Sequence, residues 1–337
     1  MVLPKYNIKL SIFLPHTKVY GGVRHFVEVG NIFSKNGYCY TIYTHDGEKP
    51  DWIDYYGDIK SLEAAANDSH DVVITGDVGM LEVVKRINAN VKIIYVLGPR
   101  YINEYNKYLS CFQVWVGISN DWLEYFSPPE SAYYYTNPLG VNRQIFSPRC
   151  NNKNNQKGSD YIYILCFGRI NKKIKGVLDI LKAFKALKDS RAKLMMFDSN
   201  HIHLPWWSNL NIKFKRRIER YLIHDQEELV ALYNKADIFI SAERTSGWSN
   251  TSAEAMACKT AVICTPCGTR DFAIDKETAL VVPVGRPDKI KEAVELLINS
   301  SDLRARLAEN GFNKIQQFTW EAHCMCLLEI IREVKKL

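Results

Sequence analysis

The strongest constraint on the fold of this chain is a regular alternation of strand-like and helix-like segments. In the first half, short apolar segments rich in β-branched and aromatic residues fall at residues 8–14, 38–44, 71–75, 91–97 and 113–119. Between them, apolar residues recur at helical spacing over 23–36 and 78–87, and Gly37 stands where helices commonly end. This alternation predicts a parallel sheet with helices on both faces.

The alternation pauses once and then resumes, which predicts two domains. Residues 147–160, SPRCNNKNNQKGSD, contain no recurring apolar residue and are typical of a linker or exposed loop. Two α/β domains, 1–150 and 151–318, would then face each other across a cleft, with a last segment at 319–337. Neither domain has a G-x-G-x-x-G motif after its first strand, which argues against a dinucleotide-dependent oxidoreductase. In the second half we expect strands at 161–167, 192–197, 238–241 and 260–265, and helices at 175–187, 227–234, 251–258, 287–299, 301–316 and 320–336.

Composition argues against several classes of protein. The chain of 337 residues is 47% hydrophobic and 24% charged, as globular domains usually are. No apolar run approaches the roughly 20 residues of a membrane-spanning helix, and LSIFLP at 10–15 is too short for a signal peptide, so we expect a cytoplasmic protein. The nine cysteines are an odd number, and the C-x-x-C of Cys264 and Cys267 has no second pair. We therefore expect no disulfide framework and no metal site.

The net charge of +7 is concentrated in one basic run, KFKRRIER at residues 213–220. Two interpretations are open. The run is either a solvated helix face, or a surface that attracts anionic lipid or a phosphate-bearing acceptor. The second interpretation would place the protein peripherally at the inner face of the membrane. We expect no nucleic-acid partner, because the sequence has no basic motif interleaved with aromatic residues and no zinc-finger spacing.

Two cations follow the first strand of the second domain. Gly168 and Arg169 end the segment YIYILCF, and Lys175 with Gly176 opens the next helix. A diphosphate at this point would meet both positive charges and the positive end of the helix dipole. Fixed positive charge would stabilise such a group as it departs in a transfer reaction. The alternative is that both are ordinary surface cations.

Gly21 and Gly22 stand directly after the first strand of the first domain. One interpretation is a tight turn that needs a positive φ angle. The other is close approach of the backbone to a phosphate, with the dipole of the helix at 23–36 behind it.

Residues 246–272, SGWSNTSAEAMACKTAVICTPCGTRDF, combine a polar turn, a short helix, a buried strand and a loop. In open α/β sheets, ligands bind at such strand ends. The helix carries one glutamate, Glu254. Thr251 and Glu254 match a capping box, in which the glutamate side chain only bonds back to the helix start. A ligand-binding carboxylate is the competing interpretation.

This stretch resembles the signature of the GT-B glycosyltransferases, and within them the retaining, glycogen-synthase-like enzymes of glycosyltransferase family 4. That signature is a glutamate, seven residues, and then Glu-Ala-Met-Ala. Residues 254–257 match its second half, whereas Ser246 stands at the position of the first glutamate. Three other segments resemble family elements, namely YGGVR at 20–24, NPLGVN with FSP between 137 and 148, and FTW at 318–320.

The resemblance implies a GT-B fold of two Rossmann-like domains, with a C-terminal helix at 319–337 crossing back onto the first. It implies that Arg169 and Lys175 stabilise the leaving diphosphate and that Glu254 holds the ribose. With serine at 246, the family's glutamate contact with the donor sugar is lost or water-mediated. Glu243, three residues earlier, would be the acid to compensate, although it is out of register. The remaining expected donor-binding residues are Gly21, Gly22, Gly168, Ser246, Gly247, Trp248, Ser249, Asn250, Thr251 and Gly268.

The implied activity is that of a retaining hexosyltransferase, in which a sugar passes from a UDP- or GDP-linked donor to a glycan or lipid-linked hydroxyl. Polysaccharide biosynthesis is the implied setting. We expect no cofactor, and no metal, because the chain has no D-x-D motif. Two alternatives stay open. One is a non-catalytic GT-B protein that binds glycan or nucleotide, and the other is a GT-B sugar-nucleotide epimerase or phosphorylase.

Overall fold

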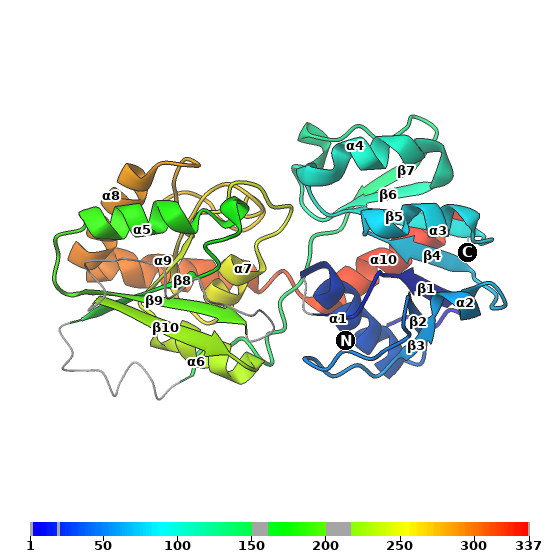
Figure 1. Ribbon diagram of the computed structural model, residues 1–337, viewed down its shortest axis with the longest axis horizontal. Coiled ribbons are helices and arrows are strands. Elements are labelled where there is room, and N and C mark those ends of the chain that lie inside the picture. Colours follow the sequence, from blue (N-terminus) through cyan, green and yellow to red (C-terminus); the bar gives the residue numbers. More distant parts are fainter. Residues whose placement is uncertain (1–2, 19–20, 150–160, 200–216, 336–337) are drawn as a thin grey trace. The chain divides into compact units, whose positions relative to one another are not determined.

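The computed structural model describes residues 3–18, 21–149, 161–199 and 217–335 (Figure 1). It divides into two compact units, Met1–Gly140 with Phe318–Leu337, and Val141–Gln317. Both are α/β units built on parallel sheets, as the sequence predicts. Residues 150–160 of the expected linker at 147–160, and residues 213–216 of the basic run, lie outside the described residues.

The first unit is built on a sheet of seven strands in the order β3-β2-β1-β4-β5-β6-β7. Every neighbouring pair of strands is parallel. The central strands are continuous apolar runs, because helices cover them on both faces. The strands are β1 Lys9–Phe13, β2 Cys39–Thr44, β3 Asp58–Ser61, β4 Val72–Thr75, β5 Val91–Val96, β6 Val114–Gly117 and β7 Tyr133–Thr136.

Helices cover both faces of this sheet. One face packs against α2, α3 and α4 through an aromatic-rich cluster that includes Phe13, Trp115 and Trp122. Residues on α1 and α10 contact the other face, where Tyr40 of β2 donates a hydrogen bond to the Phe26 carbonyl. The helices are α1 Gly21–Lys35, α2 Leu62–Ala65, α3 Leu81–Arg86, α4 Ile102–Tyr105 and α10 Trp320–Lys335, with short 3-10 turns at Val78–Met80, Pro99–Tyr101, Asn106–Cys111 and Trp122–Glu124.

A buried polar cluster fixes α10 to the rest of the first unit. The Nε2 atoms of His25, on α1, and His323, on α10, lie 2.9 Å apart. His323 Nδ1 lies 2.9 Å from the carbonyl oxygen of Pro138, so Nδ1 carries the proton and Nε2 accepts from His25. Asn137 donates to the His323 carbonyl and to the Tyr95 hydroxyl. Residues distant in sequence therefore meet in one hydrogen-bonded network.

The second unit is built on six parallel strands in the order β10-β9-β8-β11-β12-β13. Counted within the unit, this is the order 3-2-1-4-5-6 of a doubly wound dinucleotide-type sheet. From β8 the chain adds β9 and β10 on one side of the sheet, and from β11 it adds β12 and β13 on the other side. The strands are β8 Ile162–Phe167, β9 Ala192–Ser199, β10 Ile218–Ile223, β11 Ile238–Ser241, β12 Ala261–Cys264 and β13 Leu280–Val281.

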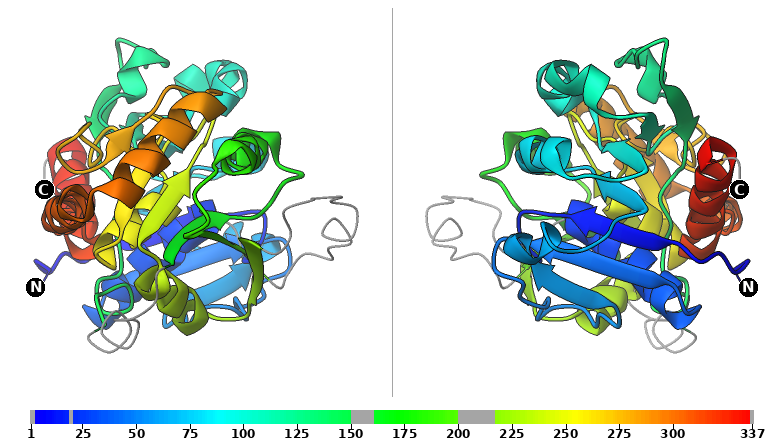
Figure 2. Two further views of the ribbon diagram at one scale, coloured as in Figure 1. Left: turned by 90° about the vertical axis from the view of Figure 1, so that its left-hand side faces the viewer. Right: turned by 90° about the vertical axis from the view of Figure 1, so that its right-hand side faces the viewer.

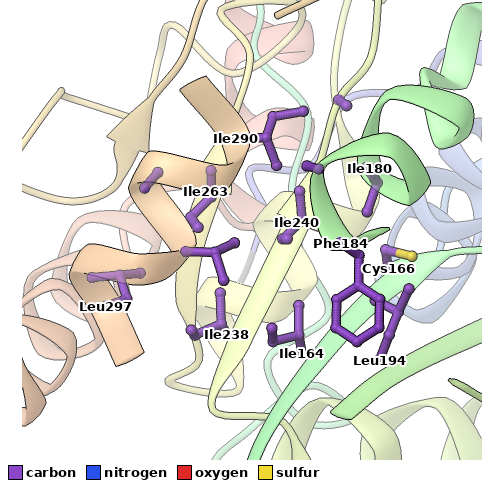
Figure 3. Packing of buried hydrophobic residues seen from close by; sticks show 14 of the residues in the cluster. Ile164, Cys166, Ile180, Phe184, Leu194, Ile238, Ile240, Ile263, Ile290 and Leu297 are labelled. Atoms are coloured by element: carbon purple, nitrogen blue, oxygen red, sulfur yellow. The ribbon is translucent and has the colours of Figure 1, made fainter. Parts of the chain in front are cut away.

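Two helices, α5 Val177–Ala186 and α8 Pro287–Asn299, pack on one face of this sheet (Figures 1 and 2). Alternate strand residues such as Ile164, Ile238 and Ile263 meet Phe184 and Ile290 from these helices (Figure 3). The other face carries Phe239, whose ring contacts Tyr233 of α6 Gln226–Lys235. The remaining helices are α7 Asn250–Ala257 and α9 Ser301–Ile315.

Two interpretations of local sequence are wrong. Gly21 and Gly22 are the first two residues of α1, so they belong to a helix and not to the tight turn considered above. The described part of the basic run is not a helix face, because Ile218 begins β10. Arg217 is held by the protein itself, since its guanidinium donates to the carbonyls of Leu187, Asp189 and Ala192.

Candidate functional site

The carboxyl ends of β8 and β11 are where the sheet topology leads us to expect a ligand site in the second unit. The strand order reverses between these two neighbours, and in doubly wound sheets ligands bind where the loops after two such strands diverge. Arg169 and Lys175 follow β8, and residues 242–249 follow β11. Most of the residues singled out from the sequence thus lie at the carboxyl end of the strands of this one sheet.

Arg169 is engaged with a buried carboxylate. Its guanidinium donates to Asp198 Oδ1 through Nη2 at 2.7 Å and through Nε at 3.2 Å. Asp198 lies near the end of β9 and is fully buried, and the arginine is 13% exposed. Arg169 also stacks over the ring of Phe167. The arginine is therefore not a solvated surface cation, and its orientation is fixed from two sides.

Lys175 is also ion-paired, with Glu243, two residues beyond β11. The segment that carries the lysine packs against the strand end. The amide of Arg244 donates to the Ile174 carbonyl at 2.7 Å, and Gly176 takes a φ of +63°. A Cβ atom at Gly176 would lie 1.8 Å from the carbonyl oxygen of Ala242, so only glycine permits this contact.

The loop at 246–249 is tied to the loop after β12. Ser246 Oγ donates to the Trp248 carbonyl at 2.9 Å, and the Ser249 amide donates to the Gly268 carbonyl at 2.7 Å. Gly268 has a φ of +69°, and a Cβ there would come within 2.9 Å of both Ser246 Oγ and Trp248 backbone. The Ser249 amide, expected to contact the donor, is instead used within the protein.

Glu254 is not a capping-box partner of Thr251. The N-cap of α7 is Ser249, so Glu254 lies in the second turn of the helix. The hydroxyls of Ser249 and Ser252 are instead 3.0 Å apart at the helix start. Glu254 Oε2 accepts a hydrogen bond from the Tyr233 hydroxyl at 3.0 Å, and the residue is 4% exposed.

The N-terminus of α7 supplies backbone hydrogen-bond donors. Asn250 and Thr251 are in the first turn of α7, where backbone amides have no carbonyl one turn earlier within the helix. Gly168 and Gly247 are buried beside the cations and the helix start, respectively. Gly21 and Gly22 belong to the first unit, at the N-terminus of α1 after β1. Their part in any site stays a prediction.

Two residues of this region, Asp198 and Tyr233, were not singled out from the sequence, whereas Glu243 was considered there only as an out-of-register substitute for the acid absent at 246. Asp198 ends the apolar run of β9, and a carboxylate at a parallel strand end is a usable signal. Tyr233 carries no such signal, since it reads as one more apolar residue of α6.

Within the described residues, no group of three or more histidine, cysteine or acidic side chains could hold a metal ion. Across the same residues, no helix is long and apolar enough to cross a membrane.

Comparison with known proteins agrees with this geometry. Residues 150–314 match the family model "Glycosyl transferases group 1". Over 171 residues the chain is 28% identical to the capsular polysaccharide biosynthesis glycosyltransferase CapM of Staphylococcus aureus, covering 48% of this chain and 45% of CapM. Over 109 residues it is 29% identical to an uncharacterized glycosyltransferase of Methanocaldococcus jannaschii, covering 32% and 31%. The chain thus spans less than half the length of these curated relatives.

Solved structures extend the likeness to both units. Sucrose-phosphate synthase from Thermosynechococcus elongatus superposes with a TM-score of 0.79 at 16% identity, covering 98% of this chain and 99% of that one. HepE of Anabaena, solved in complex with UDP and glucose, gives 0.78 at 10% identity, covering 97% and 100%. Together with the two parallel α/β units, these likenesses define the fold as GT-B. The matched family model then places residues 150–314 among the group 1 glycosyltransferases.

Proposed function

We propose that this protein transfers a sugar from a nucleotide-diphosphate donor to an acceptor hydroxyl, with retention of anomeric configuration, as a member of glycosyltransferase family 4. The observation that carries the proposal is the convergence of two cations, a helix N-terminus and the buried carboxylate of Glu254 on one sheet edge. A nucleoside diphosphate has complementary groups, since its phosphates match the cations and amides and its ribose hydroxyls match a carboxylate.

In the proposed reaction, the acceptor hydroxyl attacks the anomeric carbon from the face that the diphosphate leaves. The carbon–oxygen bond to the diphosphate breaks, and its electron pair stays with the diphosphate. The departing diphosphate takes the acceptor proton. Arg169 and Lys175 would stabilise the growing negative charge, and the amides of Asn250 and Thr251 would add the helix dipole.

The ion pairs set a condition on this role. Arg169 and Lys175 are matched by Asp198 and Glu243, so these four groups have no net formal charge. Each cation must therefore act through donors left over from its carboxylate partner. An ammonium carries three N–H donors and a guanidinium five, so a single cation can hold a carboxylate and a phosphate oxygen at once.

The acceptor and the setting are also part of the proposal. The similarity to CapM, named for capsular polysaccharide biosynthesis, supports a glycan or lipid-linked acceptor. HepE was solved with UDP-glucose, which supports a UDP-linked donor, with a GDP-linked donor as the alternative. We propose that no cofactor and no metal take part, and that the protein acts in the cytoplasm, with peripheral contact to the anionic inner face of the membrane.

A thermal-shift panel tests the donor class. UDP or GDP, or one of their sugars, should raise the melting temperature, whereas NAD and NADP should not. At 100 times Kd the stabilisation should be about 2.7 kcal/mol. If every nucleoside diphosphate leaves the melting temperature unchanged while NAD raises it, the glycosyltransferase proposal is wrong.

Ser246 favours a second candidate, a protein that binds a nucleotide sugar without transferring it. The serine hydroxyl is used on the Trp248 carbonyl, so this position offers no carboxylate to a donor sugar. This candidate predicts nucleotide binding with no release of UDP or GDP in the presence of glycan acceptors. The proposed transferase instead predicts release that depends on the acceptor. Donor isomerisation without release would indicate an epimerase, and release driven by inorganic phosphate would indicate a phosphorylase.

A further inference from the structure

Glu243 has one carboxylate oxygen in use and one without a partner. The residue is 3% exposed, and its Oε1 atom binds the Lys175 ammonium. Its Oε2 atom is buried and has no hydrogen-bond partner among the described residues. Buried polar atoms are nearly always hydrogen-bonded, because leaving one unsatisfied destabilises the folded protein. An unpaired carboxylate oxygen next to the proposed nucleotide-sugar site therefore points to a ligand that supplies a hydrogen-bond donor.

The Glu243 side chain lines a pocket that other polar groups share. Lys175, Ser241 and Thr251 line the same pocket, together with the ring of Phe167. The backbone of Glu243 is fixed, because Thr265 Oγ1 donates to its carbonyl at 2.6 Å. The carboxylate stands only two residues beyond β11. Its position is therefore set by the sheet and not by a free loop.

The chemistry of the pair selects the kind of group that fits. An ionised carboxylate only accepts hydrogen bonds, so the partner of Oε2 must donate one. A phosphate oxygen cannot do so at neutral pH and would be repelled. At Oε2 itself, the negative carboxylate favours a neutral hydrogen-bond donor over an anion. A sugar hydroxyl meets each requirement, since it is neutral and donates.

We propose that Glu243 Oε2 accepts a hydrogen bond from a hydroxyl of the donor sugar, and so acts as a specificity-determining residue. Through Oε1, Glu243 orients Lys175, which would bind the diphosphate. Glu243 thereby supplies the acid that position 246 lacks. This inference rests on the proposed function, because it takes the pocket to be part of the donor site.

Calorimetric titration with matched ligands tests it. UDP is compared with UDP-glucose, and GDP with GDP-mannose, on the wild-type protein and on Glu243→Gln. The glutamine keeps the size of the side chain but turns one oxygen into a donor. The affinity for the nucleoside diphosphate should change less than about threefold. The additional affinity contributed by the sugar should fall roughly 10- to 100-fold, because a hydrogen bond to a charged group is lost.

Two further variants keep the test decisive. Glu243→Asp retains the charge but withdraws the carboxylate by one methylene, so it should also lose the additional affinity contributed by the sugar. If the glutamine variant fails to fold, the aspartate variant still provides the test. Glu295→Gln is the matched control, because Glu295 pairs with Lys291 on the surface of α8. It should leave both affinities unchanged.

Deoxyfluoro analogues of the sugar identify the contact. Fluorine cannot donate a hydrogen bond, so replacing one hydroxyl should weaken wild-type binding about tenfold or more. The same analogue should cause no further loss of affinity in Glu243→Gln, since the fluorine and the glutamine each remove the same hydrogen bond.

The outcomes separate the two proposals. If the wild-type protein binds none of the four ligands, the proposed function and this inference both fail. If it binds a nucleotide sugar and Glu243→Gln keeps the full sugar contribution, this inference alone is wrong. Oε2 is then satisfied by a water molecule only.

Discussion

The buried histidine pair of the first unit should make the protein lose stability as the pH falls from 6.5 toward 4. Burial, together with the neighbouring His323, holds the pKa of His25 well below its usual value. Burial lowers the pKa of His323 to about 4, although its hydrogen bond to the Pro138 carbonyl opposes this shift. Both side chains are therefore neutral in the folded protein at neutral pH.

The direction in which stability changes with pH follows from how many protons the folded and unfolded states bind. The unfolded chain binds these protons near pH 6.5, and the folded state does not until a much lower pH. Protonation therefore favours the unfolded state as the pH drops. For His323, a shift from 6.5 to about 4 corresponds to about 3 kcal/mol. This contribution is fully present above pH 6.5 and is lost by about pH 4. His25 acts in the same direction.

The contacts of His323 explain how this stability would be lost at low pH. A proton on His323 Nε2 would remove the acceptor for the His25 Nε2–H, which lies 2.9 Å away. It would also face the Asn137 amide, which already donates to His323. Because this network joins α10 to α1 and β5, we expect α10 to detach first. Trp320, whose ring stacks with His25 at 5.8 Å, is a natural fluorescence probe.

Urea unfolding at constant ionic strength between pH 4 and 7 measures the effect, with His323→Gln as the matched variant. Glutamine offers an acceptor to His25 but does not titrate. The free energy of unfolding should fall with decreasing pH in the wild type, and less steeply in the variant. Equal slopes in the two proteins, or a flat wild-type profile above pH 4.5, would refute the reasoning.

Three other predictions concern the second unit. Arg169→Ala should destabilise the protein by about 3–5 kcal/mol, since it removes the guanidinium that the buried Asp198 binds; an unchanged melting temperature would contradict this. Glu254→Gln should lower nucleotide affinity by about 1–3 kcal/mol with little change in stability, because the amide oxygen can still accept from Tyr233; calorimetry showing equal affinity would leave Glu254 a structural residue. Turnover should survive exhaustive chelation, because two cations already lie at the proposed diphosphate site, and rescue by added Mg²⁺ or Mn²⁺ would overturn that view.

How well the sequence predicts the fold depends on where a strand lies in its sheet. Every strand flanked by two others was predicted, because burial on both faces demands a continuous apolar run. The missed strands are β3, β7, β10 and β13, which are the four edges of the two sheets. Edge strands are half exposed, as the alternating pattern of DIKS in β3 shows. Their polar and short segments therefore give no run to detect.

The site was predictable in part for a similar reason. The positions of Arg169, Lys175 and Glu254 follow from local features, namely a strand end, a helix start and a short motif. The carboxylates that pair with the cations do not. Asp198 lies 29 residues from Arg169, and Glu243 lies 68 residues from Lys175. Only the parallel strand order brings them together.

The helix start at α7 shows how tertiary contacts override a local motif. Thr251 and Glu254 have capping-box spacing, yet the helix begins two residues earlier. The bond from the Ser249 amide to the Gly268 carbonyl holds the chain at that point, so Ser249 becomes the N-cap. Glu254 is thereby released from capping and turned toward Tyr233. The same contact that defeats the local prediction therefore also sets the direction of the Glu254 carboxylate.

The serine at 246 and the glutamate at 243 are best understood together. An acid at 246 would sit in a loop, next to the backbone of Gly268 and Trp248, where Ser246 Oγ is 2.9 Å from a Cβ built on Gly268. An acid at 243 sits instead where the strand has just ended, with its carbonyl and its neighbour's amide both hydrogen-bonded. A carboxylate held by the sheet has less freedom than one held by a loop, so it discriminates more sharply between ligands that differ in one hydroxyl. The shift of the acid by three residues therefore predicts a donor preference that is narrow and set by a single hydroxyl.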